Sequence, residues 1–145
     1  MNVLDIPFNA FLKIERPPVD SPFLLRLAES PCYLNHVGTV HASAQLALAE
    51  AGSGQWLMQA LPHLIDKAVA VVRRVEAKFK SPMKGDIFSR AVTSCEEIRR
   101  SAEPIVIKGL AIVPVTIEIV DAAGNVGLIA TFEWFAQKLG ENGVS

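Results

Sequence analysis

The chain has 145 residues, of which half are hydrophobic and a fifth are charged, and its formal net charge is −1. A charge this close to zero disfavours a general nucleic-acid binder. No apolar run is long enough to span a bilayer, and the first residues lack the basic start and apolar core of a signal peptide. Two cysteines, Cys32 and Cys95, make neither a disulfide framework nor a zinc site, so we expect free thiols, a cytoplasmic location and a single domain over residues 1–145.

The N-terminal part is expected to contain two short elements. Four apolar residues share one phase of a two-residue alternation over residues 6–15 and predict a first strand: Phe8, Ala10, Leu12 and Ile14. After a Pro-Pro break, Pro22 stands where a helix begins, and Asp20 or Ser21 is placed to cap it. The pattern therefore predicts a short helix over residues 21–30.

The central stretch, residues 35–54, reads NHVGTVHASAQLALAEAGSG and is built largely from helix-forming residues. Its apolar character runs around most of the helix circumference, so we expect a buried central helix with a sheet packed closely against it. Thr39 or Ser43 is the expected N-cap, and Gly52 and Gly54 are expected to end the helix. A second, short helix is expected over residues 55–61.

The clearest strand covers residues 66–80. Charged residues alternate with apolar ones, as in a sheet with one buried and one solvated face. The apolar phase comprises Val69, Val71, Val75, Ala77 and Phe79. Arg73 interrupts this phase, either because it lies at a bulge or because it pairs with a carboxylate of a partner subunit.

The remaining elements alternate between strands and one helix. Strands are expected over residues 87–93, 105–120 and 126–135, with residues 121–125 as a hairpin loop. Ser94 and Glu97 have capping-box spacing and predict a helix over residues 95–102. Pro114 lacks a backbone donor and therefore marks a sheet edge or a bulge. The polar tail, residues 138–145, is expected to be loose.

Glu50 is the ionisable residue within the apolar central helix. A carboxylate in such a helix costs free energy unless it is paired, hydrated or protonated. Two interpretations follow. Glu50 points to solvent near the end of the helix, or it is a functional carboxylate in a cleft, where burial tunes its pKa.

The spacing of five residues favours the functional interpretation. Asn35, Gly38, Thr39, His41 and Glu50 follow the order N-x-x-G-T-x-H-x(8)-E. This pattern resembles the hotdog-fold thioesterases, in particular the PaaI-like branch and the related DUF4442 group, whose usual pattern is N-x-x-G-x-x-H-G-G followed by an acidic residue at the same offset. The resemblance implies an α+β hotdog fold, in which an antiparallel sheet of five to six strands wraps around a central apolar helix.

The resemblance also implies a chemistry of thioester hydrolysis. Glu50 matches the family's acidic catalyst, as general base or nucleophile, and Asn35 matches the asparagine that orients water or the carboxylate. His41 matches the histidine that begins the helix; its role is positional, or that of a hydrogen-bonded structural histidine. Free amides and the helix dipole favour negative charge near Ala42 and Ser43, which makes these amides the candidate oxyanion donors.

Gly38 and Thr39 complete the expected substrate-binding turn. Ala42 and Ser43 stand where the family has two glycines that lie against the thioester. This departure motivates a second hypothesis, a non-catalytic hotdog dimer that binds an acyl group or CoA. A hydratase of the same fold is a third hypothesis, which the spacing between Asn35 and Glu50 fits less well.

The resemblance implies partners as well. The site is built between two subunits, with Asn35 of one facing Glu50 of the other, so we expect a homodimer or a dimer of dimers. The expected substrate is an acyl-CoA or related thioester, with CoA only as part of the substrate and with no other cofactor. Four basic residues are candidates for its phosphates, or form an ordinary solvated face: Lys78, Lys80, Lys84 and Arg90. The histidines, His36, His41 and His63, show no metal-ligand spacing, and no membrane partner is expected.

Overall fold

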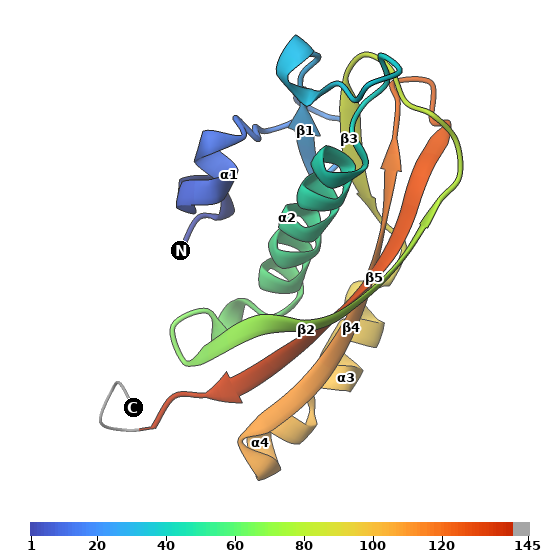
Figure 1. Ribbon diagram of the computed structural model, residues 1–145. Helices are drawn as coiled ribbons and strands as arrows, with labels where there is room; N and C mark the ends of the chain where they lie inside the picture. Colours follow the sequence, from blue (N-terminus) through green and yellow to red (C-terminus); the bar gives the residue numbers. More distant parts are fainter. Residues whose placement is uncertain (141–145) are drawn as a thin grey trace.

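The computed structural model describes residues 1–140 and contains one five-stranded antiparallel sheet curled around a long helix (Figure 1). This confirms the predicted α+β architecture. The strand order is β1-β3-β4-β5-β2. The strands are β1 (Leu25–Leu27), β2 (Ala68–Phe79), β3 (Ile87–Ala91), β4 (Leu110–Val120) and β5 (Val126–Lys138). The helices are α1 (Pro7–Phe11), α2 (Ala42–Ala60), α3 (Cys95–Ala102) and α4 (Pro104–Lys108), with 3-10 turns at Val3–Asp5, Pro31–Tyr33 and Pro62–Leu64.

Helix α2 fills the concave side of the sheet, and its small residues allow the strands to come close (Figure 1). A Cβ atom at Gly52 would lie 2.6 Å from Ser89 Oγ of β3, so only glycine fits there. A Cβ atom at Gly54 would meet the Trp134 ring at 3.5 Å, an ordinary contact. The prediction that these glycines end the helix, and that a second helix follows over residues 55–61, is wrong. Gly52 permits close packing, and α2 continues to Ala60.

Both predictions for the N-terminal part are wrong. Residues 7–11, within the predicted strand, form α1, because Pro7 occupies the first helical position, where its missing N–H costs nothing. Residues 21–30 contain strand β1 in place of a helix. Leu25 and Leu27 are both buried and alternate with half-exposed Arg26, which is a two-residue period too short to stand out within an apolar run.

Strand β2 confirms the strand predicted over residues 66–80, but its buried phase is not the one expected. The register with β5 shifts between Val72 and Arg74, which makes Arg73 the extra residue of a β-bulge. Before the bulge, Val71 lies opposite Phe135 on the convex face of the sheet. After it, Val75 lies opposite the buried Phe132 on the concave face. The bulge therefore divides the single apolar phase between two faces.

Between β3 and β4, the predicted helix is confirmed, but the strand predicted to follow it begins later than expected. Helix α3 spans the predicted residues, and its capping box is complete, because the Ser94 side chain accepts from the Glu97 amide and the Glu97 side chain accepts from the Ser94 amide. Residues 105–108, expected as the start of a strand, belong to helix α4 instead, which Gly109 ends with a φ of +73°. Pro104 stands at the first position of that helix.

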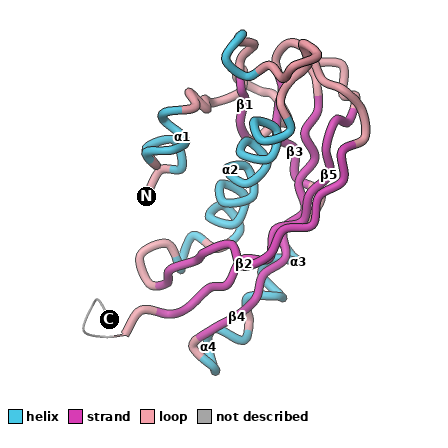
Figure 2. Tube along the Cα trace, viewed as in Figure 1, coloured by secondary structure: helices cyan, strands magenta, loops and turns pink. Residues whose placement is uncertain are grey.

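The C-terminal half of strand β4 lies between two strands, whereas its N-terminal half is paired on one side only. Pairing with β3 covers residues 117–120, whereas pairing with β5 covers the whole of β4 (Figure 2). Thr116 directs its backbone toward the segment that follows β3, since Val92 N–H donates to Thr116 O (3.0 Å). Pro114, two residues earlier, faces the same side, beyond the end of β3. It therefore occupies a local edge, as predicted.

The hairpin between β4 and β5 is confirmed over residues 121–125, where Asp121 N–H donates to Asn125 O (3.1 Å). Strand β5 extends to Lys138, whose amide donates to Gly109 O (2.8 Å). Of the predicted loose tail, residues 141–145 lie outside the described residues.

Candidate active site

The turn before α2 is closed by the asparagine of the motif. Asn35 Oδ1 accepts from the amides of Val37 and Thr39, both at 3.0 Å, and Asn35 Nδ2 donates to Thr39 Oγ1 (2.8 Å). Gly38 has a φ of +76°, which residues with a side chain rarely adopt. Asn35, Gly38 and Thr39 are therefore brought together, and within one chain the Asn35 amide is engaged in shaping this turn.

His41 is the N-cap of α2, so the expectation that Thr39 or Ser43 caps the helix is wrong. His41 Nδ1 accepts from the Ser43 amide (3.0 Å), which gives the imidazole the role that a serine or threonine oxygen usually has. Its backbone N–H donates to Tyr33 O (2.7 Å). The ring itself is exposed. This geometry agrees with a positional role, and an acceptor at Nδ1 places the proton of the neutral ring on Nε2.

The two candidate oxyanion donors differ in availability. Ser43 N–H is already occupied by His41. Ala42 is the first residue of α2, so its amide has no acceptor within the helix. Both residues are exposed, and the positive end of a 19-residue helix dipole lies at this point. The Ala42 amide is therefore the more accessible donor for a developing negative charge.

Glu50 lies two turns further along α2 and is neither fully exposed nor enclosed. Its carboxylate makes no hydrogen bond or ion pair with any residue among the 140 that the structure describes. Burial raises the pKa of the Glu50 carboxyl above its ordinary value. A half-buried carboxylate without a partner and with a pKa raised by burial has the properties expected of a candidate general base.

Glu50 is held in place through the backbone of its helix. Ser53 Oγ donates to Glu50 O (2.7 Å) and accepts from Trp134 Nε1 of β5 (3.0 Å). Trp134 in turn lies opposite Val72, the residue before the bulge of β2. The turn of α2 that carries Glu50 is thus fixed at the level of the β2 bulge.

The candidate donor and the candidate base are far apart within one chain. Ala42 and Glu50 are separated by eight residues of continuous helix, which is about 12 Å along its axis. A glutamate side chain does not span that distance to a shared reacting carbon. One copy of the chain therefore does not bring the two groups to the same thioester.

The four basic residues proposed for CoA phosphates do not share one environment. Arg90 is bonded to Glu118 through Nε (3.1 Å) and Nη2 (2.7 Å). The other three, Lys78, Lys80 and Lys84, are exposed and form no ion pair within residues 1–140. These lysines remain available cations, whereas Arg90 is committed to a neighbouring strand.

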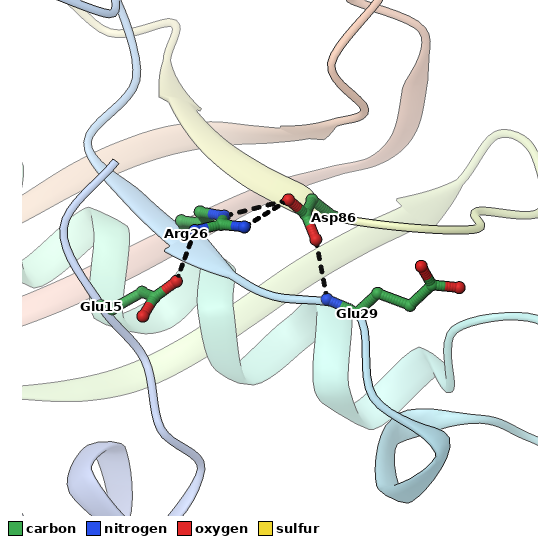
Figure 3. Close-up of polar contacts among 4 residues, drawn as sticks. All are labelled: Glu15, Arg26, Glu29 and Asp86. Atoms are coloured by element: carbon green, nitrogen blue, oxygen red, sulfur yellow. Dashed lines mark hydrogen bonds and ion pairs between the residues drawn. The ribbon is translucent and has the colours of Figure 1, made fainter. Parts of the chain in front are cut away.

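A polar cluster that sequence analysis missed supports the turn beside the motif (Figure 3). Asp86 accepts from Arg26 through Nε (3.1 Å) and Nη2 (2.5 Å) and from the Glu29 amide (2.8 Å), while Arg26 Nη1 donates to Glu15 (2.8 Å). The hydrogen bond from the Glu29 amide, followed by the contacts with Arg26, lowers the pKa of Asp86. The same β2–β3 turn accepts the Val40 amide at Met83 O (2.9 Å), so the cluster holds the turn against the start of α2.

The described residues show neither a membrane-crossing helix nor a metal cluster. None of their helices is both long and apolar enough to cross a bilayer. No three histidine, cysteine or acidic side chains in this part of the chain gather in a way that would hold a metal ion.

Solved structures with the same fold include proteins described as thioesterases or probable thioesterases. A Pseudomonas aeruginosa protein, described as a protein of unknown function and a probable thioesterase, is 23% identical, with a TM-score of 0.76 over 94% of this chain and 91% of that one. A Haemophilus influenzae thioesterase is 12% identical, with a TM-score of 0.64 over 94% and 86%. A Bacillus halodurans protein crystallised with CoA is 20% identical, with a TM-score of 0.64 over 89% and 74%.

These likenesses confirm the hotdog fold expected from the motif. No curated protein sequence matches the chain. The family described as domain of unknown function DUF4442 matches residues 22–135, which include the motif turn, α2 and all five strands as far as Phe135. The chain therefore belongs to the DUF4442 family of hotdog-fold proteins.

Proposed function

We propose that this protein is an acyl-CoA thioesterase that works as a homodimer, with Glu50 as the catalytic carboxylate. The observation that carries the proposal is the state of Glu50: half-buried, without a partner, and with a pKa raised by burial, on the helix whose start carries the motif. Structural neighbours described as thioesterases, and one crystallised with CoA, support the substrate class.

The proposed reaction uses one water molecule. Glu50 takes a proton from water, and the water oxygen attacks the thioester carbonyl carbon. The Ala42 amide at the positive end of α2 stabilises the oxyanion. The carbon–sulfur bond then breaks, and the CoA thiolate leaves and receives the proton, giving a carboxylic acid and free CoA.

The 12 Å between Ala42 and Glu50 on one helix supports a site shared by two subunits. In the proposed dimer, Glu50 of one protomer meets Asn35 and the Ala42 amide of its partner. Asn35 orients the water or the carboxylate, and His41 keeps the start of the helix in place. The exposed lysines Lys78, Lys80 and Lys84 are the proposed contacts for the CoA phosphates.

The test is release of free thiol from short, medium, long and aromatic acyl-CoAs. We expect turnover by the parent protein and a loss of at least 100-fold in Glu50→Gln, since general-base catalysis contributes about 10²–10⁴-fold. Glu103→Gln, a change at an exposed glutamate beside α3, is the matched control and should keep full activity. Equal rates in the parent and in Glu50→Gln would refute the proposed role.

The second candidate is a dimer that binds acyl-CoA without hydrolysing it. The observation that favours it is the Ser43 amide, which His41 occupies at the position where the family pattern has a glycine. Calorimetric titration with a non-hydrolysable acyl-CoA analogue distinguishes the two. Tight binding without turnover of any acyl-CoA would support the binding protein, and turnover would exclude it.

A further inference from the structure

Ser53 is a serine inside α2, three residues after Glu50, and none of its surface is exposed (0%). A hydroxyl buried away from water costs free energy unless its hydrogen-bonding capacity is used. Ser53 Oγ donates to Glu50 O (2.7 Å) and accepts from Trp134 Nε1 of β5 (3.0 Å). One buried hydroxyl therefore joins the backbone at Glu50 to the sheet.

The chemistry of the indole fixes the direction of this link. An indole N–H only donates, so the Ser53 oxygen must accept from Trp134. The hydroxyl carries a single proton, which is then directed to the Glu50 carbonyl. A serine hydroxyl without such a donor rotates to whichever acceptor is near. Trp134 therefore sets the orientation of the Ser53 hydroxyl.

This link is the only hydrogen bond that a residue of α2 makes with a strand within residues 1–140. Other side-chain hydrogen bonds of the helix reach loops or α3: Trp56 Nε1 donates to Thr93 O, beyond the end of β3 (2.8 Å), and Arg99 Nε of α3 donates to Ala60 O (3.3 Å). The rest of the contact between α2 and the sheet is packing without hydrogen bonds. Apolar packing is non-directional, so it does not by itself fix how far the helix slides or rotates.

Trp134 gives the link a rigid base. Strand β5 pairs with β2 on one side and with β4 on the other, and Trp134 lies opposite Val72 and Val113 in these ladders. Its ring lies beside Gly54, where a Cβ atom would meet ring atoms at 3.5 Å. Gly54 follows Glu50 by four residues and so lies on the same face of α2, one turn further on. The ring is therefore held against the turn that follows the carboxylate.

We propose that Ser53 and Trp134 are positioning residues for Glu50: the Trp134 indole orients the Ser53 hydroxyl, which holds the Glu50 backbone at one place relative to the sheet. This inference rests on the proposed role of Glu50 and adds two residues that touch no reacting atom. Within residues 1–140 the Glu50 side chain has no polar partner, so its placement depends on its backbone. A misplacement of about 1 Å can cost about 100-fold in rate.

The anchoring is tested first without substrate. The chain has two tryptophans, so its proton–nitrogen NMR spectrum has two indole signals, and Trp56 is the internal reference. We expect Ser53→Ala to shift the Trp134 signal and to speed its exchange with solvent at least about 10-fold, with Trp56 unchanged. Exchange of the Gly54 amide, which bonds to Glu50 O within the helix, should rise as well. Unchanged exchange at both groups would overturn the proposal.

Steady-state kinetics then test the consequence for the reaction. We expect Ser53→Ala and Trp134→Phe each to lower kcat for the best acyl-CoA at least about 10-fold, with KM changed less than about 3-fold, because substrate contacts remain. The double variant should be no slower than the slower single variant, since both changes break the same link. Ser94→Ala is the matched control: it removes the cap of α3 and lowers stability, but it should keep the kcat of the parent.

The outcomes separate this inference from the thioesterase itself. A parent-like kcat in Ser53→Ala, or losses that multiply in the double variant, would overturn the positioning role. A parent protein that hydrolyses no acyl-CoA would refute the proposed function. The exchange measurements need no substrate, so they would still decide whether Ser53 and Trp134 hold Glu50 in place.

Discussion

The contact between Gly52 and Ser89 leads to a paired prediction on one helix. Replacing Gly52 by alanine adds a Cβ atom 2.6 Å from Ser89 Oγ and 2.7 Å from Ser89 Cβ, whose side chain is buried and accepts from the Leu25 amide (3.1 Å). Glycine to alanine in a helix gains about 1 kcal/mol, while forcing an extra group into a packed core costs about 1–3 kcal/mol. Because this clash involves two atoms of a fixed β3 residue, we expect Gly52→Ala to lower the free energy of unfolding by about 1–2 kcal/mol.

Gly54→Ala is the matched comparison, two residues further along α2. Its new Cβ atom would meet the Trp134 ring at 3.5 Å, so the helix gain is expected without a clash. We expect Gly54→Ala to raise the free energy of unfolding by up to about 1 kcal/mol, which separates the two variants by about 1–3 kcal/mol. Urea unfolding followed by far-ultraviolet circular dichroism at one fixed protein concentration measures both. Equal stabilities of the two variants would refute the claim that close packing on Ser89 requires glycine.

Three further changes test the charges and caps described above. Burial raises the pKa of Glu50, so the ionised carboxylate lowers the stability of the folded state. Glu50→Gln should therefore be more stable than the parent at pH 7 in thermal unfolding. This advantage should shrink as the pH falls toward about 4, where the parent carboxyl becomes protonated in both states. Asp86→Asn removes the carboxylate that binds Arg26, and we expect the free energy of unfolding at pH 7 to fall by about 1–2 kcal/mol. Because the pKa of Asp86 is lowered in the folded state, the difference from the parent should narrow as the pH falls below about 4. A difference that does not depend on pH would contradict this. Ser94→Ala breaks the capping box with Glu97 and should cost about 1 kcal/mol in urea unfolding, whereas an unchanged midpoint would show that the cap is dispensable.

Local patterns predicted the elements whose cause is local. The alanine and leucine content of α2 and the capping box of α3 are properties of neighbouring residues; α3 forms over the predicted residues, and α2 forms in the predicted stretch but continues past Gly54 to Ala60. Strand β1 was missed because its three residues are specified by pairing with β3 rather than by their own pattern. Gly52 was misread for a similar reason, since its role is set by Ser89, which is distant in the sequence.

The same distinction applies to the candidate site. The motif spacing placed Asn35 on a turn, His41 at the start of the central helix and Glu50 within that helix. It did not reveal that His41 caps the helix by accepting the Ser43 amide, because histidine is an uncommon N-cap. Nor did it reveal the Arg26–Asp86 pair, whose members are 60 residues apart and meet only when β1 lies beside β3.

The unequal edges of the sheet also govern how far an assembly can grow. A sheet with two long open edges adds copies at both and extends into a fibre. Here one outer strand, β1, has only three residues, and the open half of β4 carries Pro114, which has no amide to offer an incoming strand. Among the described residues, only β2 then offers a long outer edge with free backbone groups, so growth at both edges of the sheet at once is disfavoured. The unequal edges therefore protect this sheet from open-ended polymerisation.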